Sequence, residues 1–172
     1  QKASIFSFVV YNICMGRGTR NKQKADISVS RRTGTNRENI EIYSRNHQTY
    51  IDKTYVDLAP EEKAWVQVAT EGLPVNDQTL IYEVGAGEGR TSRYLEELGF
   101  YPTVSDAVYE FVDILNKDGR KKPAVILDCL NQNIDPAQDL IIANAVLLHF
   151  TDKEIEEVFR RFSSSLKPEG KL

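Results

Sequence analysis

The sequence has few cysteines, only two histidines and no long apolar run. Cys14 and Cys129 form no CxxC pair, so neither a disulfide framework nor a metal site is predicted, and a reduced, cytoplasmic setting fits. No apolar stretch approaches the roughly 20 residues of a membrane helix, and no membrane partner is expected. Residues 5–15 resemble a signal-peptide core only faintly, because Tyr11 and Asn12 interrupt them. A strand or short helix is the preferred interpretation there.

Charge is unevenly distributed along a chain whose size and composition are those of one globular domain. Residues 1–37 contain eight Lys or Arg and one acidic residue, whereas residues 38–172 contain 14 basic and 24 acidic residues. We therefore expect a basic, flexible or loosely attached segment at 1–37 and a folded domain at 38–172. Because no aromatic residue for base stacking lies between 16 and 37, a solvated tail is preferred to a nucleic-acid arm.

Helices and strands alternate in the second half of the chain. Helical patterns come first, at 38–58 with one break and at 59–74. Strands are then predicted at 78–84, 101–105, 124–128 and 139–145, and helices at 90–98, 107–116 and 152–166. The strands are mostly apolar, as strands covered on both faces should be. This alternation predicts an α/β fold with a parallel sheet and right-handed crossovers.

A glycine-rich turn follows the first of these strands in "YEVGAGEGR", residues 82–90. Its spacing is GxGxG, which differs from the GxGxxG of dinucleotide-binding folds and lacks the lysine of a phosphate-binding P-loop. Glycines let the backbone approach a ligand closely. Two carboxylates, Glu83 and Glu88, would repel a pyrophosphate but suit a ligand with an ammonium and hydroxyls, such as S-adenosylmethionine.

This turn resembles motif I of the class I S-adenosylmethionine-dependent methyltransferases. Three further blocks follow in the family's order, "VSDAVYEFV" at 104–112, "ILDCLNQ" at 126–132 and a long stretch from 139 to 172. The resemblance covers about three quarters of the chain and implies a Rossmann-like, doubly wound, mainly parallel sheet with helices on both faces and a helical N-terminal extension. The family's fold usually has seven strands. Here the fifth is expected to begin only at Leu172, so the sheet is expected to be C-terminally incomplete.

The resemblance also implies a set of cofactor-binding residues: Glu83, Gly85, Ala86, Gly87, Gly89, Asp106, Ala107, Asp128, Cys129 and Asn144. Glu83 would organise the loop and the methionine ammonium, Asp106 would bind the ribose hydroxyls, and Asp128 would accept from the adenine amino group. Two alternatives stay open, since Asp106 can cap the next helix and Asp128 can form a turn. Tyr43 and Tyr50 are interpreted as packing residues rather than ligand contacts.

The catalytic residues are not identified by the sequence. Methyl transfer can be driven largely by alignment of the reactants, so a general base is optional. His149 is a weak candidate, because nothing near it in the sequence would orient its imidazole. The fourth strand ends in "NAVL" rather than the Asn/Asp-Pro-Pro-aromatic motif of base-amino methyltransferases, and neither cysteine follows a proline as in cytosine C5 enzymes.

A methyltransferase acting on a small-molecule acceptor is therefore the leading hypothesis. A non-catalytic cofactor-binding or interaction module, and an RNA methyltransferase that uses the basic segment, are the alternatives. A second copy of the chain could cover the sheet edge left by the missing strands, so a homodimer is a further expectation.

Overall fold

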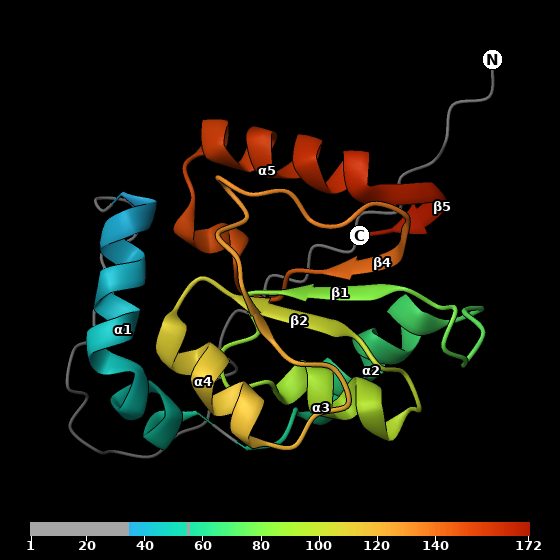
Figure 1. Cartoon of the computed structure of the whole chain (residues 1–172), viewed down its shortest axis with the longest axis horizontal. Helices are drawn as coiled ribbons and strands as arrows, with labels where there is room; N and C mark the ends of the chain where they lie inside the picture. Colours follow the sequence, from blue (N-terminus) through green and yellow to red (C-terminus); the bar gives the residue numbers. More distant parts are fainter. Residues whose placement is uncertain (1–34, 55) are drawn as a thin grey trace.

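The computed structural model describes residues 35–54 and 56–172 (Figure 1). The strands among them are β1 (Ile81–Val84), β2 (Thr103–Asp106), β3 (Val125–Ile126), β4 (Gln138–Ile142) and β5 (Leu166–Lys171). The helices are α1 (Asn36–Lys53), α2 (Pro60–Thr70), α3 (Arg90–Glu97), α4 (Tyr109–Lys117), the 3-10 helix η1 (Leu147–His149) and α5 (Asp152–Ser165). The element expected at 5–15, and the basic segment up to residue 34, lie outside the described residues.

The five strands form one parallel sheet in the order β3-β2-β1-β4-β5. From the central β1 the chain proceeds to β2 and β3 on one side and then returns to the other side for β4 and β5. Helices α2, α3 and α4 cover one face of the sheet and α5 covers the other (Figure 1). The predicted doubly wound α/β fold is therefore confirmed. In such sheets ligands bind beyond the carboxyl ends of the strands where the order reverses, which here means between β1 and β4.

The side chains of β1 alternate between the two faces of the sheet. Ile81 belongs to a buried apolar cluster with Leu95 of α3. Tyr82 belongs to the opposite cluster, which contains Phe162 of α5. Successive residues of a strand point to opposite faces, so Glu83 points to the same side as Ile81. The strand thus carries one acidic side chain toward the α3 face, directly before the glycine-rich turn.

The fifth strand begins earlier than the sequence predicts. It was expected only at Leu172, whereas β5 pairs with β4 through Leu166 opposite Gln138 and Lys171 opposite Leu140, with an irregular register between the two pairs. The prediction is wrong because the Lys-Pro-Glu-Gly segment forms a bulge within the strand instead of a turn that precedes it. The part of the chain that the structure describes therefore contains a complete β4–α5–β5 unit.

Two other elements differ from their sequence patterns. Helix α1 is continuous from Asn36 to Lys53, where one break was expected. Strand β3 is only two residues long and lies at the edge of the sheet, where Val125 and Ile126 are 39% and 52% exposed rather than covered on both faces. Within the described residues, no helix is long and apolar enough to cross a membrane.

Thr151 begins α5 with a reciprocal cap, and its loss should weaken the fold. Its hydroxyl accepts from the Glu154 N–H at 3.4 Å, and the Glu154 carboxylate accepts from the Thr151 N–H at 2.8 Å. We expect Thr151→Ala to lower the free energy of unfolding by about 1 kcal/mol, measured by urea denaturation. Ser163→Ala, on the exposed side of the same helix, is the control and should cost nothing. Equal stabilities for the two variants would contradict the capping role.

Candidate cofactor and acceptor site

The glycine-rich turn after β1 has left-handed backbone at each glycine, but the three positions differ in what surrounds them. A Cβ at Gly85 would lie 2.3 Å from a methyl group of Val146, and one at Gly89 would lie 2.5 Å from a methyl group of Leu115. At Gly87 the nearest atom would be a ring carbon of Tyr50, at 3.8 Å. Gly85 and Gly89 therefore permit close packing of the protein on itself, whereas a Cβ at Gly87 would make an ordinary van der Waals contact with Tyr50 of α1.

Glu83 is a buried acid at the end of the central strand, with only 2% of its surface exposed. Its Oε2 atom is buried and has no hydrogen-bond partner among the described residues. Burial raises the pKa of Glu83 from 4.5 to about 7, although the Ser92 hydroxyl and the Arg120 guanidinium lower it in part. An unsatisfied buried carboxylate is costly, so this position suits a cationic group that supplies the missing donor.

Asp106 ends β2 and holds the glycine-rich turn in place. Its Oδ2 accepts from the Gly87 N–H at 2.8 Å and its Oδ1 accepts from the Val108 N–H at 2.9 Å. Burial raises the pKa of Asp106, and these backbone donors oppose that rise. The residue thus stabilises the turn that precedes α4, whose N-cap is Val108 without a side-chain cap bond, and also links β2 to the turn of β1. Each carboxylate oxygen keeps a lone pair for a further donor.

Asp128 follows β3 and is already well supplied with donors. Its carboxylate accepts from the side-chain amide of Asn36 at 2.9 and 3.0 Å, from that of Asn131 at 2.7 Å and from the Leu130 N–H at 3.1 Å. It therefore acts as a turn former and also attaches the start of α1. Cys129 is buried in the apolar core, and burial raises the pKa of its thiol to about 12, so its side chain serves packing.

The other predicted positions lie around the same edge of the sheet. The Ala86 N–H donates to the Ser105 carbonyl at 3.0 Å, and Ala107 is half-buried directly after Asp106. Asn144 was expected at the end of β4 but lies in the turn beyond it. Its neighbour Ala145 has a φ of 57°, a left-handed conformation that is uncommon for a residue with a side chain.

Helix α1 lies across the carboxyl edge of the sheet and contacts the loop after β3, the start of α4 and η1. Beside the bond from Asn36, Asn39 donates to the His149 carbonyl at 3.2 Å, and the Ser44 hydroxyl donates to Glu110 Oε1 at 2.8 Å. The Tyr43 hydroxyl lies 3.4 Å from His149 Nε2. These contacts join α1 to the β3 loop, to α4 and to η1, which is consistent with its position in Figure 1.

Four rings form what we call the aromatic cluster: Tyr43, Tyr50, Phe111 and His149. Tyr43 meets Tyr50 at 5.6 Å and His149 at 5.3 Å between ring centroids, both edge to face. Tyr50 meets Phe111 at 5.6 Å, also edge to face. Sequence reasoning took the two tyrosines for packing residues. Their spacing of seven positions, which is two helical turns, was the available sign that they share one face of α1.

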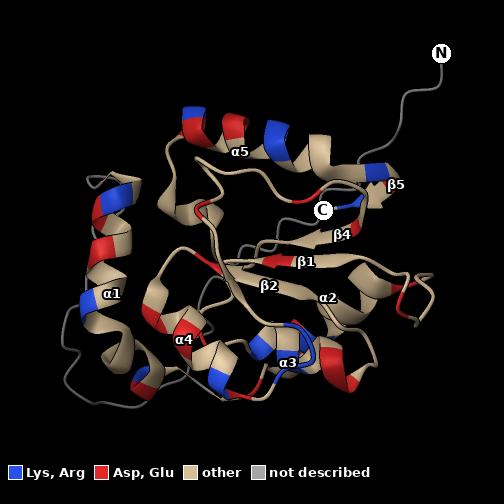
Figure 2. Ribbon diagram, viewed as in Figure 1, with Lys and Arg blue, Asp and Glu red and all other residues tan. Residues whose placement is uncertain are grey.

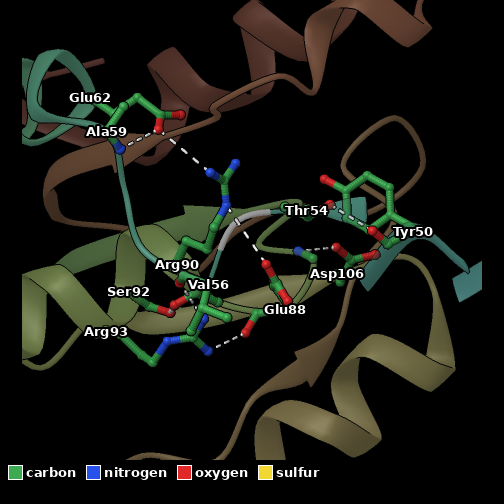
Figure 3. A network of polar contacts seen from close by, with 12 residues as sticks. Tyr50, Thr54, Val56, Ala59, Glu62, Glu88, Arg90, Ser92, Arg93 and Asp106 are labelled. Carbon is green, nitrogen blue, oxygen red and sulfur yellow. Dashed lines mark hydrogen bonds and ion pairs between the residues drawn. The ribbon is translucent and has the colours of Figure 1, made fainter. Parts of the chain in front are cut away.

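A polar network fixes the other end of the glycine-rich turn, as Figure 3 shows. Arg93 donates to the Glu88 carbonyl at 2.6 Å and to the Val56 carbonyl at 3.2 Å. Arg90 lies 3.5 Å from Glu62 of α2 and 3.8 Å from the Glu88 carboxylate. Two arginines of α3 therefore hold the turn, α2 and the segment before α2 together. The Glu88 carboxylate belongs to this structural network.

Comparisons with known proteins agree with this geometry. Residues 82–172, more than half of the chain, match the family model described as a methyltransferase domain. The chain belongs to this family. The expected class, the Rossmann-like S-adenosylmethionine-dependent methyltransferases, is thereby confirmed. A search of the curated proteins found no significant match.

Solved structures of this class share the fold at low sequence identity. A DhpI complex with SAM and HEP has a TM-score of 0.61 at 19% identity, and the match covers 80% of this chain and 65% of that one. A TehB-like SAM-dependent methyltransferase from Corynebacterium glutamicum has a TM-score of 0.56 at 19% identity, covering 78% and 71%. The glycopeptide N-methyltransferase MtfA has a TM-score of 0.53 at 17% identity, covering 63% and 51%.

The buried charge of Glu83 should make stability depend on pH. Its pKa is about 7 in the folded chain against 4.5 for an ordinary glutamate, so the folded state binds the extra proton between these values. Stability should therefore fall as pH rises from about 4.5 to about 7. We expect Glu83→Gln to remove this slope and to raise the free energy of unfolding at pH 8 by up to about 3 kcal/mol. Urea denaturation of the wild type and the variant at pH 5 and pH 8 measures the free energy of unfolding and its change with pH.

Glu97→Gln is the control, since Glu97 is exposed on α3. It should follow the wild type at both pH values. A Glu83→Gln variant that is less stable than the wild type at pH 8 would mean that the Glu83 carboxylate is compensated within the protein.

Proposed function

We propose that the chain binds S-adenosylmethionine at the glycine-rich turn of β1 and transfers its methyl group to a small-molecule acceptor. The observation that carries the proposal is the unpaired oxygen of Glu83, buried beside the turn that Asp106 holds. A carboxylate without a donor suits the ligand's ammonium group. Glu83 and Asp106 would both repel the phosphates of a dinucleotide, since a pyrophosphate bound there would meet two buried carboxylates.

The relatives support the cofactor but leave the acceptor open. Two solved DhpI structures are complexes with SAM and with SAH, and the MtfA structure holds S-adenosylmethionine. The chain spans 65% of the length of the first DhpI structure, so the activity of the whole protein is part of the proposal. MtfA is a glycopeptide N-methyltransferase, and that acceptor is not carried over to the present chain.

Each residue of the site has a role in holding such a cofactor. Glu83 would accept from the ammonium group, and Asp106 would use its free lone pairs for the ribose hydroxyls. The Asp128 carboxylate already accepts from the Asn36 side-chain amide, so an adenine amino group would bind the carboxylate beside that amide or in its place. When bound, the cofactor supplies an electrophilic methyl group. The chain contributes alignment of the two reactants and exclusion of water, for which α1 lies over the site.

His149 is better supported as a proton acceptor than the sequence suggested. The sequence offered no group to orient its ring, but the Tyr43 hydroxyl lies within 3.4 Å of Nε2. Burial lowers the pKa of His149, which favours the neutral imidazole that can take up a proton. Its role as a base stays a proposal. Alignment alone is sufficient for acceptors that are already nucleophilic.

Gly87 provides the sharpest test of the cofactor site. We expect Gly87→Ala to weaken binding of S-adenosylmethionine at least about tenfold in calorimetry, because the new methyl group, in contact with Tyr50, would take up the room beside the turn that a bound ligand needs. Gly72→Ala is the matched control. Gly72 also has a positive φ, of 79°, but it lies in the turn between α2 and β1, before the amino end of that strand, and a Cβ added there would meet no atom within 4 Å.

The control separates backbone strain from the loss of ligand space. Both variants should lose similar stability, whereas only Gly87→Ala should lose affinity. Heat on titrating NAD or ATP into the wild-type chain, with none for S-adenosylmethionine or S-adenosylhomocysteine, would refute the proposed function.

A further inference from the structure

A second carboxylate, which the cofactor site does not use, lies where α1 meets the start of α4. Glu110 is the second residue of α4, and its Oε1 accepts from the Ser44 hydroxyl at 2.8 Å. Its Oε2 is buried and has no hydrogen-bond partner in the described part of the chain. Phe111, the next residue of α4, packs on Tyr43 and Tyr50 of α1, so Glu110 and the aromatic cluster belong to the same interface between α1 and α4.

The charges around the aromatic cluster are negative. Burial and the neighbouring Tyr50 raise the pKa of Tyr43, and the Asp106 carboxylate adds to that rise by repelling the phenolate; Asp106 likewise adds to the rise that burial causes in the pKa of Glu83. The start of α4 is coloured as acidic in Figure 2, next to α1. Two basic residues of α1 point away, since Arg37 and Arg45 both pair with Glu41 and their side chains are 88% and 76% exposed.

The inner face of α1 instead presents neutral polar and aromatic groups. Asn39, Tyr43, Ser44 and Tyr50 contact η1 or α4. Among the described contacts of Glu110 and Asp106, none is with a Lys or Arg side chain. An acceptor that carries a carboxylate or phosphate would therefore meet uncompensated negative charge, whereas a cation would complete the bonding of Glu110.

We propose that the acceptor is a small organic amine, whose ammonium form is bound by Glu110 Oε2 and whose apolar part packs on the aromatic cluster. The faces of tyrosine and phenylalanine rings attract cations in addition to apolar groups, so the rings and the carboxylate both favour a ligand that carries an ammonium group. This inference rests on the proposed function, because it assigns the acceptor of the methyl transfer.

The same groups account for the protons of the reaction. The bound ammonium must first lose one proton, which the Tyr43 hydroxyl can take up while it passes its own proton to His149 Nε2. The lone pair of the neutral amine then forms the bond to the methyl carbon, and the electron pair of the broken carbon–sulfur bond stays on sulfur. The product is the N-methylated ammonium, so charge and atoms balance without a further reactant.

Three probes of similar size test the proposal: 2-phenylethylamine, 2-phenylethanol and phenylacetate. Each is titrated by calorimetry into the full chain saturated with S-adenosylhomocysteine. We expect the amine to bind at least about tenfold more tightly than the alcohol, and the acid to bind more weakly still. Glu110→Gln should weaken the amine about 10- to 100-fold and leave the alcohol unchanged, since a hydrogen bond to a charged group is lost.

Glu156→Gln, an exposed acid on α5, is the control and should change no affinity. The amide introduced by Glu110→Gln keeps an oxygen that can accept from Ser44, and a thermal melt of each variant verifies folding. Equal or tighter binding of the alcohol or acid, no binding of the amine, or an equal loss for all probes in Glu110→Gln would overturn the amine assignment while the proposed function stands. Absence of S-adenosylhomocysteine binding would overturn both.

Discussion

The carboxylate of Glu83 is the constraint around which the rest of the site is arranged. It ends the central strand, only 2% exposed, and one of its oxygens has no donor within the described structure. The positive charge of Arg120 offsets part of the negative charge of Glu83. The Arg120 guanidinium is held in place because it donates to the Ser92 hydroxyl at 3.0 Å and to the Glu96 carboxylate at 2.8 Å. A sheet built only for stability would place an apolar residue here, as at Ile81 two positions earlier.

Helix α1 completes the site by bringing distant parts of the chain together. Its contacts reach the loops after β3 and β4 and the start of α4, over sequence separations of 92, 110 and 66 residues. The glycine-rich turn and Asp106 lie at the carboxyl edge of the sheet, and α1 adds Tyr50 beside Gly87. In the function proposed above, cofactor binding and acceptor selection would therefore depend on different elements. The first would use the turn and strand ends of the methyltransferase fold, and the second would use α1 and α4.

The sequence predicted what local patterns encode. Apolar runs, caps and the GxGxG spacing led correctly to the parallel sheet, its crossovers and the turn at Gly85–Gly89. Asp106 was predicted from its place after the second strand, and its bond to the Gly87 N–H follows from the parallel pairing of β1 with β2. These features depend on neighbours in sequence or on strand order, which periodicity reveals.

What the sequence did not predict depends on packing between distant residues. The sequence did not single out Arg120, which lies in a polar turn, yet its side chain is 3% exposed and its charge lowers the pKa that burial raises at Glu83. Nor did it single out Glu110, at the start of α4. The predicted start of the fifth strand was wrong for a related reason. The bulge, and not the hydrophobic pattern, decides the register between β4 and β5.

The central claim is that the ligand's ammonium group supplies the donor that Glu83 lacks, and the pH dependence of binding tests it most directly. S-adenosylmethionine is titrated into the chain by calorimetry at pH 5.5 and pH 7.5, with Glu83→Gln as the comparison. Because the pKa of Glu83 is about 7 without ligand, binding should require loss of its proton at the lower pH. The account predicts an affinity about tenfold or more higher at pH 7.5 for the wild type, and no such change for Glu83→Gln. An affinity that is equal at the two pH values in the wild type, or a pH dependence that survives in Glu83→Gln, would contradict it.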